Sequence, residues 1–322
     1  YWGSTDGGEN ADAWEHVVAL GTREAGLVWT EVADLAENTT YYYRLFASNS
    51  FGGRWTSTSV RFTTAFETPG IKRNGLVLWL RADAGVQHSN GWVHAWADQA
   101  TDVGGANDAA AVGNSRPLFV PEGIDGRAAI RFDGTDDFLA VPDHDALDLG
   151  TGAGKGWTVL TVYLREKSGT QCIVSKGTAG SDTTDWRFFS DDAGVIWGSG
   201  PASDTNAWFR VAEPPANQPH LLAATLTQTG ETEGTKVFYI NGQPHPSGLY
   251  AAKASANDHP MVIGGFAASS GNLGGLVAEV LVFNRVLNED DLNNAGWYLQ
   301  QKYGINGAFE YRAPRGTLLQ VR

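Results

Sequence analysis

The sequence has almost no residues that could form a covalent crosslink or supply a reactive thiol. Its 322 residues include one cysteine and one methionine, so an intrachain disulfide is excluded. Cys172 lies in the apolar run 171–177, a context that favours a small buried hydrophobic residue over a nucleophile. A chain of this length buries a large core without such crosslinks and suits one large and one small domain.

Positive charge is scarce as well. Lys and Arg number 23 against 36 Asp and Glu, which gives a net charge of -13 and a pI near 4.9. An acidic surface repels nucleic acid and anionic membranes, so neither is an expected partner. No hydrophobic run approaches the ~18 residues of a membrane span. The chain starts with Tyr1 rather than methionine, so we expect a processed or partial chain, in which the lack of a signal peptide is uninformative.

Glycine and tryptophan, in contrast, are abundant. The 40 glycines and 12 tryptophans occur in a chain with only 18% charged residues. This composition is typical of many short strands joined by turns rather than of helices. The sequence therefore predicts an all-β protein.

Residues 1–66 alternate apolar and polar positions with the period of a β-strand. The spacing of Leu35, Thr39 and Tyr41 resembles the tyrosine corner of fibronectin type III domains. That resemblance implies a small immunoglobulin-like sandwich. Counted back from the corner, the chain begins where the third strand of such a domain should lie, so the domain looks as if it lacks its first strands.

An incomplete sandwich leaves unpaired strand edges, so we expect the missing strands to lie upstream or to come from another chain. Residues 67–74 form a linker rich in breakers. Residues 309–322 follow the second domain as a tail, or as the start of a further segment, and contain the strand-like stretch 317–322. Head-to-tail strand donation is therefore an alternative to simple truncation.

Residues 75–308 contain short apolar segments separated by turn signals, which indicates two antiparallel sheets in a jelly roll. The expected strands are 75–83, 127–132, 138–142, 157–166, 171–177, 186–191, 195–200, 220–228, 236–242, 261–266 and 275–285. One helix is expected near the C-terminus, with Asn288 as its N-cap and Gly304 at its end. Its apolar stripe consists of Leu292, Ala295, Gly296, Leu299 and Tyr303.

This second domain resembles the laminin-G-like, concanavalin-A-like jelly rolls of bacterial extracellular and surface proteins. The likeness is carried, in order, by segments 75–86 and 126–142, by the Asn241-Gly242 hairpin turn in 237–243, and by segments 261–266 and 278–305, together with Trp96 and Asp98. The resemblance implies the fold. It leaves function open, because this fold hosts lectins, adhesion modules, glycosidases and lyases.

The sequence shows no spacing of acidic or basic residues that is typical of a catalytic site. A retaining glycosidase needs two carboxylates about 5 to 5.5 Å apart, whereas the last predicted strand offers only Glu279, and Glu231 and Glu233 lie in a hydrophilic turn. A lyase needs a base beside cationic groups, and neither Tyr239 nor His220 has a basic cluster near it in sequence. We therefore expect no catalytic residues and no enzyme.

Metal binding is a separate question. The histidines have no zinc-ligand spacing. Calcium prefers oxygen ligands in loops, which makes Asp133, Asp136 and Asp137 of the stretch FDGTDDF candidates together with Asp98. Asp108 and Glu279 are further candidates for this one structural ion. The alternative is an ordinary hairpin turn whose aspartates accept turn amides.

Sugar recognition by a sandwich uses exposed aromatic rings that stack on pyranose faces, helped by polar side chains. The expected ligand-binding residues lie on the central predicted strands and their loops and are Trp186, Arg187, Trp197, Trp208 and Arg210. The alternative is that these tryptophans fill the core, since a sandwich of this size needs many large residues there.

These observations favour a non-catalytic binding or adhesion protein, extracellular or on a bacterial cell surface, that recognises glycans or partner proteins through the jelly roll. A structural subunit of a surface layer or fibre, assembled through the sandwich modules and the tail, is the alternative. A polysaccharide-active enzyme is the third hypothesis.

Overall fold

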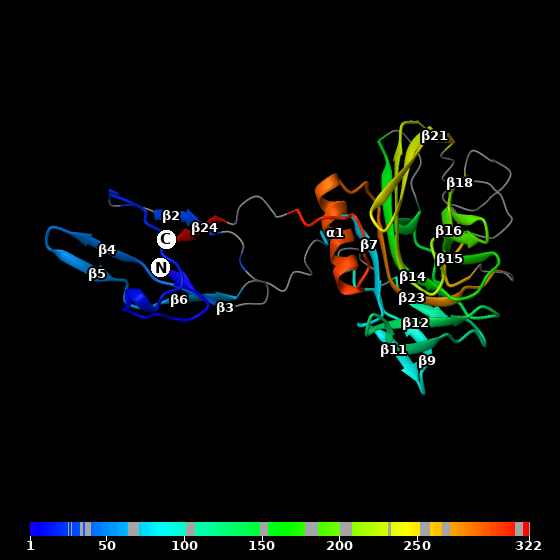
Figure 1. The fold of residues 1–322 in the computed structure, drawn as a ribbon, viewed down its shortest axis with the longest axis horizontal. Helices are drawn as coiled ribbons and strands as arrows, with labels where there is room; N and C mark the ends of the chain where they lie inside the picture. Colours follow the sequence, from blue (N-terminus) through cyan, green and yellow to red (C-terminus); the bar gives the residue numbers. More distant parts are fainter. Residues whose placement is uncertain are drawn as a thin grey trace. The chain divides into compact units, whose positions relative to one another are not determined.

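The structure is a computed structural model, and it describes the greater part of the chain (Figure 1). The described residues are 1–24, 26, 28–32, 35, 40–63, 71–100, 107–148, 154–177, 186–199, 208–230, 233–251, 258–265, 271–312 and 318–321. They divide into two compact units. Unit 1 comprises Tyr1–Pro69 together with Arg312–Arg322, and unit 2 comprises Gly70–Tyr311.

Unit 1 is built from short strands and one 3-10 turn at Ala11–Ala13. Its strands are β1 (Trp2–Gly3), β2 (Val28–Glu31), β3 (Thr40–Tyr43), β4 (Phe46–Asn49), β5 (Gly52–Trp55), β6 (Val60–Thr63) and β24 (Leu318–Val321). Strands β1, β3 and β6 form one sheet, and β4 and β5 form a hairpin. Tyr41 is buried and packs against the rings of Trp2 and Phe62. Part of the predicted tyrosine corner, residues 36–39, lies outside the described residues.

Of the predicted tail 309–322, residues Arg312–Arg322 belong to unit 1, whereas Phe309 is buried in the second apolar cluster of unit 2. Strand β24 pairs antiparallel with β2, and the register places Thr30 opposite Leu319. The strand-like pattern that the sequence shows at 317–322 thus corresponds to a strand, and its partner is the N-terminal unit of the same chain.

Unit 2 is the predicted jelly roll of two packed layers. The first layer has the order β11-β12-β23-β14-β19-β20-β21, with β7 beside β23. The second has the order β13-β22-β15-β16-β17-β18, extended by β10, β9 and β8. Strand β9 also pairs with β11, so hydrogen bonding links the two layers.

The strands of unit 2 range from three residues, as in β10, to ten, as in β14, β19 and β23. They are β7 (Leu76–Arg81), β8 (Val86–Ser89), β9 (Trp92–Trp96), β10 (Ala109–Ala111), β11 (Leu118–Ile124), β12 (Arg127–Asp133), β13 (Leu139–Val141), β14 (Gly156–Arg165), β15 (Gln171–Lys176), β16 (Trp186–Asp191), β17 (Gly194–Ser199), β18 (Trp208–Val211), β19 (Pro219–Gln228), β20 (Glu233–Ile240), β21 (Gln243–Ala251), β22 (Met261–Ile263) and β23 (Gly274–Phe283). A 3-10 turn covers Asp145–Leu147.

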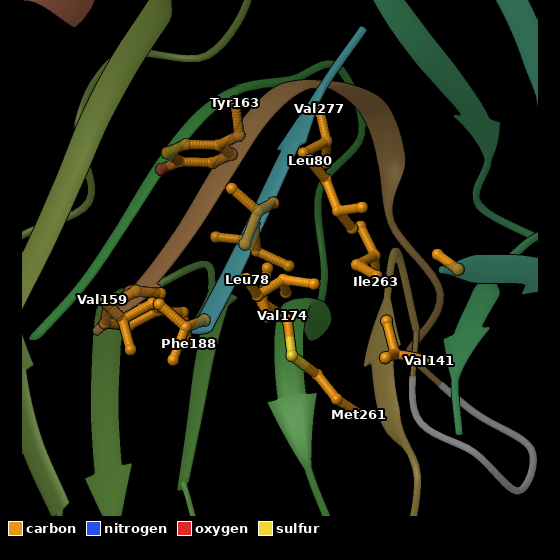
Figure 2. Packing of buried hydrophobic residues seen from close by; sticks show 14 of the residues in the cluster. Leu78, Leu80, Val141, Val159, Tyr163, Val174, Phe188, Met261, Ile263 and Val277 are labelled. Carbon is orange, nitrogen blue, oxygen red and sulfur yellow. The ribbon is translucent and has the colours of Figure 1, made fainter. Parts of the chain in front are cut away.

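The main core lies between the two layers. Figure 2 shows Val159 and Tyr163 of β14 facing Val174 and Phe188 of β15 and β16, all completely buried. A second apolar cluster covers the other face of the first layer. Strand β14 therefore contacts apolar side chains on both faces, which explains why its sequence is a nearly continuous apolar run rather than an alternating one.

The helix α1 (Glu289–Lys302) is where the sequence predicts it. The side chain of Asn288 accepts a hydrogen bond from the amide of Asp291 at 2.8 Å, and Gly304 follows the helix with φ +60. Its buried stripe packs on the first layer (Figure 1). Gly296 belongs to this stripe because a Cβ there would meet the ring of Phe309 at 2.1 Å. None of the helices described here is long and apolar enough to cross a membrane.

A buried charged group joins the helix to the sheet. The carboxylate of Glu279 on β23 is inaccessible to solvent and accepts hydrogen bonds from Trp79 Nε1 at 2.6 Å, Lys302 Nζ at 2.6 Å and Tyr303 Oη at 2.8 Å. Lys302 also pairs with Asp83 at 3.1 Å. Glu279 is thereby engaged in the protein interior, which does not support its role as a calcium ligand.

Candidate functional site

The acidic stretch FDGTDDF forms a tight connection between β12 and β13. The side chain of Asp133 accepts hydrogen bonds from the amides of Thr135 at 2.7 Å and Asp136 at 3.3 Å, an arrangement typical of an Asx turn. Gly134 has φ +76, and a Cβ there would lie 3.1 Å from the Cα of Gly274. The turn requires glycine both for its backbone angle and for the close approach of β23.

Hydrogen bonds to Asp137 link this turn to the loop 113–116, which is distant in sequence. Its carboxylate accepts one hydrogen bond from the amide of Arg116 and one from the amide of Asp133, each at 3.1 Å. Ser115 reinforces the contact, because its hydroxyl donates to the carbonyl of Phe138 at 2.8 Å and accepts from the same residue's amide at 2.6 Å. The loop 113–116 and the acidic turn therefore form one ordered rim.

Three carboxylates converge on this rim. One oxygen from each of Asp133, Asp136 and Asp137 lies within 4.8 Å of the others. Burial raises the pKa of Asp137, and the nearby charge of Asp133 raises it further. Burial alone would raise the pKa of Asp133 as well, but the hydrogen bonds from Thr135 and Asp136 outweigh it, so that pKa is lowered. At neutral pH the rim is strongly negative.

A cleft of about 320 Å³ opens beside the three carboxylates. It is lined by Trp92, Asn114, Arg116, Asp133, Asp136 and Asp137. Trp92 begins β9, directly after the Asn90-Gly91 turn, and pairs with Leu118 of β11. Figure 1 places β9, β11 and β12 next to one another in the jelly roll. Because Trp92 is 49% exposed, much of its indole surface is open to a ligand.

Three polar side chains of the cleft are not engaged with the rest of the described protein. The side chains of Asn114, Arg116 and Asp136 make no hydrogen bond or ion pair within the described part of the chain. Arg210 differs, since it pairs with Asp191 through two hydrogen bonds of 2.8 and 2.7 Å. An open indole face beside free amide, guanidinium and carboxylate groups is the combination that binds sugars by stacking and hydrogen bonding.

From the sequence, the aromatic residues expected to bind a sugar are Trp186, Trp197 and Trp208 rather than Trp92. For Trp186 that prediction is wrong. Trp186 is completely buried in the core, where it packs against Phe188. An indole with no accessible surface cannot stack on a sugar. Arg187 is also buried, with its guanidinium 5.6 Å from the ring centre of Phe189, and burial lowers its pKa to about 10.

The other predicted platform residues lie on β17 and β18. The backbone register places Trp197 opposite Phe188 and Trp208 opposite Gly198, but the side chains of Trp197 and Trp208 lie outside the described part of the structure. Arg210 is engaged in its ion pair with Asp191. The structure therefore does not assemble the five predicted ligand-binding residues into one site.

Asp98 is not part of the acidic group that the structure forms. Its carboxylate accepts hydrogen bonds from the amides of Trp79 at 2.8 Å, Ala100 at 2.9 Å and Asn107 at 3.3 Å, and its own amide donates to Asp108 at 2.8 Å. Asp98 and Asp108 thus hold a loop against β7. The predicted calcium set reduces to the three aspartates of the turn.

Three residues of the cleft were missed from the sequence: Trp92, Asn114 and Arg116. Alternation along the strand does not identify Trp92, because Trp96 has the same parity in β9 and is completely buried. Asn114 and Arg116 reach the cleft through the contact of Arg116 with Asp137 and those of Ser115 with Phe138. Local sequence carries no signal for these contacts.

The residues considered for lyase chemistry have structural contacts. The ring of His220 lies 2.8 Å from the carbonyl oxygen of Pro215 through Nε2 and 3.1 Å from the amide nitrogen of Asn241 through Nδ1. Burial lowers its pKa. Burial likewise raises the pKa of Tyr239. Neither residue lines the cleft.

The fold and the cleft define a two-layer β-sandwich of the lectin type. Residues 133–293 match the profile of the concanavalin A-like lectin/glucanases superfamily, named Laminin_G_3. Because the match covers half of the chain, the protein belongs to this family. The match begins at Asp133 in the acidic turn and includes α1 up to Asn293. The comparison with curated proteins found no match.

Two solved structures align with this chain at low sequence identity, and the first of them shares the fold. A sialidase from Trypanosoma rangeli in complex with the inhibitor DANA aligns with a TM-score of 0.50 and 17% identity, covering 74% of this chain and 34% of the sialidase. The ligand-binding domain of botulinum neurotoxin serotype D, in complex with N-acetylneuraminic acid, aligns with a TM-score of 0.47 and 12% identity, covering 70% of this chain and 51% of that domain. The chain spans about a third of the length of the sialidase it matches.

Proposed function

We propose that the protein is a non-catalytic glycan-binding protein and that the cleft beside the acidic turn is its binding site. The proposal rests on one observation: the exposed Trp92 lies next to the free side chains of Asn114, Arg116 and Asp136 in a cleft of about 320 Å³. Pockets that bind small ligands have at least about this size. Membership in a superfamily of lectins and glucanases supports a carbohydrate as the ligand.

The charge of the cleft selects among carbohydrates. Its lining has three carboxylates and one guanidinium, so an acidic sugar meets net repulsion from the rim. A neutral sugar meets none, and a protonated amine gains from the carboxylates and from the face of Trp92. Without a bound cation, the cleft therefore favours neutral glycans and amino sugars over acidic ones. A calcium ion held by the carboxylates would bring the formal charge of the lining to zero and would remove this repulsion. The sialidase that shares the fold was solved with the inhibitor DANA.

The three aspartates also fit part of a calcium shell. Calcium takes six to eight oxygen ligands, and Asp133, Asp136 and Asp137 offer oxygens within 4.8 Å of one another. Asp133 and Asp137 already accept amide hydrogen bonds, so they retain only part of their capacity. In our proposal these residues hold one calcium ion whose other ligands are water or sugar hydroxyls, and the ion strengthens glycan binding.

The wider biological setting is part of the same proposal. In this proposal unit 1 is a fibronectin type III-like module that precedes the jelly roll in the chain, and the protein is an adhesion protein outside the cell or on its surface. The family also contains glucanases, so the absence of catalysis needs its own assay. Release of reducing ends from a bound polysaccharide would contradict the non-catalytic assignment.

A glycan array tests the function directly. The full chain is applied to neutral, amine-bearing and acidic oligosaccharides, with and without calcium. Binding to neutral or amine-bearing glycans that is lost in Trp92→Ala supports the proposal. Tyr311→Ala is the matched control, because Tyr311 is 45% exposed on the same unit and lies outside the cleft. No binding to any glycan, or binding unaffected by Trp92→Ala, would overturn it.

A further inference from the structure

The sheet formed by β2 and β24 joins the two ends of the chain. Val28–Glu31 pairs antiparallel with Leu318–Val321 in an unbroken register of four residues. Among the described strands, β2 pairs with no strand other than β24. A two-stranded sheet of this length has marginal stability of its own. The pairing rests on four residue pairs, so an exchange of β24 breaks few backbone hydrogen bonds.

The edge of β2 has features of a strand-acceptor site. A small cavity of about 50 Å³ lies beside it, and its lining includes Thr30 and Val32 together with Trp2, Val18 and Leu20. Strand addition takes its affinity from backbone hydrogen bonds and its specificity from such side-chain pockets. The described apolar surface is also concentrated in unit 1, where Val17, Val18, Phe46, Phe51 and Val60 are exposed.

The donor is a segment that any second copy also carries. Strand β24 follows the whole of unit 2 in the sequence and yet lies with unit 1. When the two segments that complete a domain are far apart in one chain, the same contacts can form between two chains. Its sequence, Leu-Leu-Gln-Val, has no charge that would oppose pairing with a second molecule.

We propose that the edge of β2 is a strand-acceptor site and that its partner is the Leu318–Val321 strand of a second copy of this chain, in exchange with the chain's own strand. Each exchanged strand links one copy to the next. This gives the protein a means of assembly that is independent of the glycan cleft.

Variants that each carry one added cysteine test the exchange. Thr30 and Leu319 are opposite each other in the register, where side chains lie close enough for a disulfide after substitution by cysteine. One sample carries Thr30→Cys, a second carries Leu319→Cys, and the two are mixed and oxidised. The native Cys172 is completely buried, and peptide mapping identifies the bond that forms. The off-register control replaces Leu319→Cys with Leu318→Cys, because Leu318 is opposite Glu31.

Exchange predicts a disulfide-linked dimer from the matched mixture, with a yield about tenfold above the off-register mixture. The chain's own strand competes at an effective concentration of roughly millimolar order, so tenfold dilution should lower the dimer yield about tenfold. In the double variant Thr30→Cys/Leu319→Cys, a disulfide within one chain measures the pairing of β2 with the chain's own β24. Closure of the double variant without any mixed dimer would overturn the proposal, because the chain's own strand would then be the sole occupant. The absence of both products would overturn it as well.

Discussion

The backbone amide of Arg116 donates a hydrogen bond of 3.1 Å to the carboxylate of Asp137. This contact joins a loop before β11 to the turn after β12, and it brings the free guanidinium of Arg116 to the same cleft as the acidic turn. Asp137 thus positions the loop and keeps only part of its capacity for a ligand, while the side chain of Asp136 is free and fully available to one. The two aspartates should respond differently to substitution.

The first prediction concerns that difference. Asp137→Ala leaves two partly buried amides without their acceptor, which should lower the free energy of unfolding by about 1–3 kcal/mol. Asp136→Ala should change it by less than about 0.5 kcal/mol, as is usual for an exposed residue without contacts. Denaturant unfolding of both variants measures the difference. Equal effects of the two substitutions would contradict the assigned roles.

The second prediction concerns calcium and pH. If the three carboxylates hold calcium, the ion should raise the melting temperature of the wild type but not that of Asp136→Asn. A proton competes with the ion for Asp137, whose pKa is raised. As the pH falls, calcium binding should therefore begin to weaken at a higher pH than it would if the pKa of Asp137 were that of an ordinary carboxyl group. Calorimetric titration at several pH values measures this. An affinity independent of pH would contradict ligation by Asp137.

The third prediction concerns the buried carboxylate of Glu279. Glu279→Ala removes the acceptor of three hydrogen bonds and leaves Lys302 with Asp83 alone, so it should destabilise the protein by about 3–5 kcal/mol. The double change Glu279→Leu/Lys302→Met removes both charges and should recover much of that loss. Thermal unfolding of unit 2 in the full chain provides the comparison. A double variant as unstable as the single one would show that the charge pair is not the cause.

The fourth prediction concerns His220 and acid. Its pKa is lowered by burial in the folded state, while in the unfolded chain it takes its ordinary value near 6.5. The unfolded state therefore binds more protons between the two values. The contribution of His220 to stability is present above pH 6.5 and is lost as the pH falls through the folded pKa. His220→Gln should flatten this part of the curve of unfolding free energy against pH, and an unchanged slope would contradict the assignment.

Much of the fold could be predicted because its signals are local. Asn288 and Gly304 mark the ends of α1 because each residue type favours a helix cap. The continuous apolar run of β14 predicts a strand that is buried on both faces. The site could not be predicted as well. In β16 the adjacent residues Trp186 and Arg187 are both buried, so alternation does not reveal which face is open. The cleft depends on the distant contact of Arg116 with Asp137, which no local pattern encodes.

The central claim is that Trp92 and its free polar neighbours bind a glycan. Calorimetric titration of one neutral or amine-bearing oligosaccharide into the wild type, Trp92→Ala and Tyr311→Ala tests it most directly. Loss of the stacked indole should weaken binding by at least about tenfold, which corresponds to about 1.4 kcal/mol, while Tyr311→Ala should bind like the wild type. Equal affinity for wild type and Trp92→Ala would contradict the account.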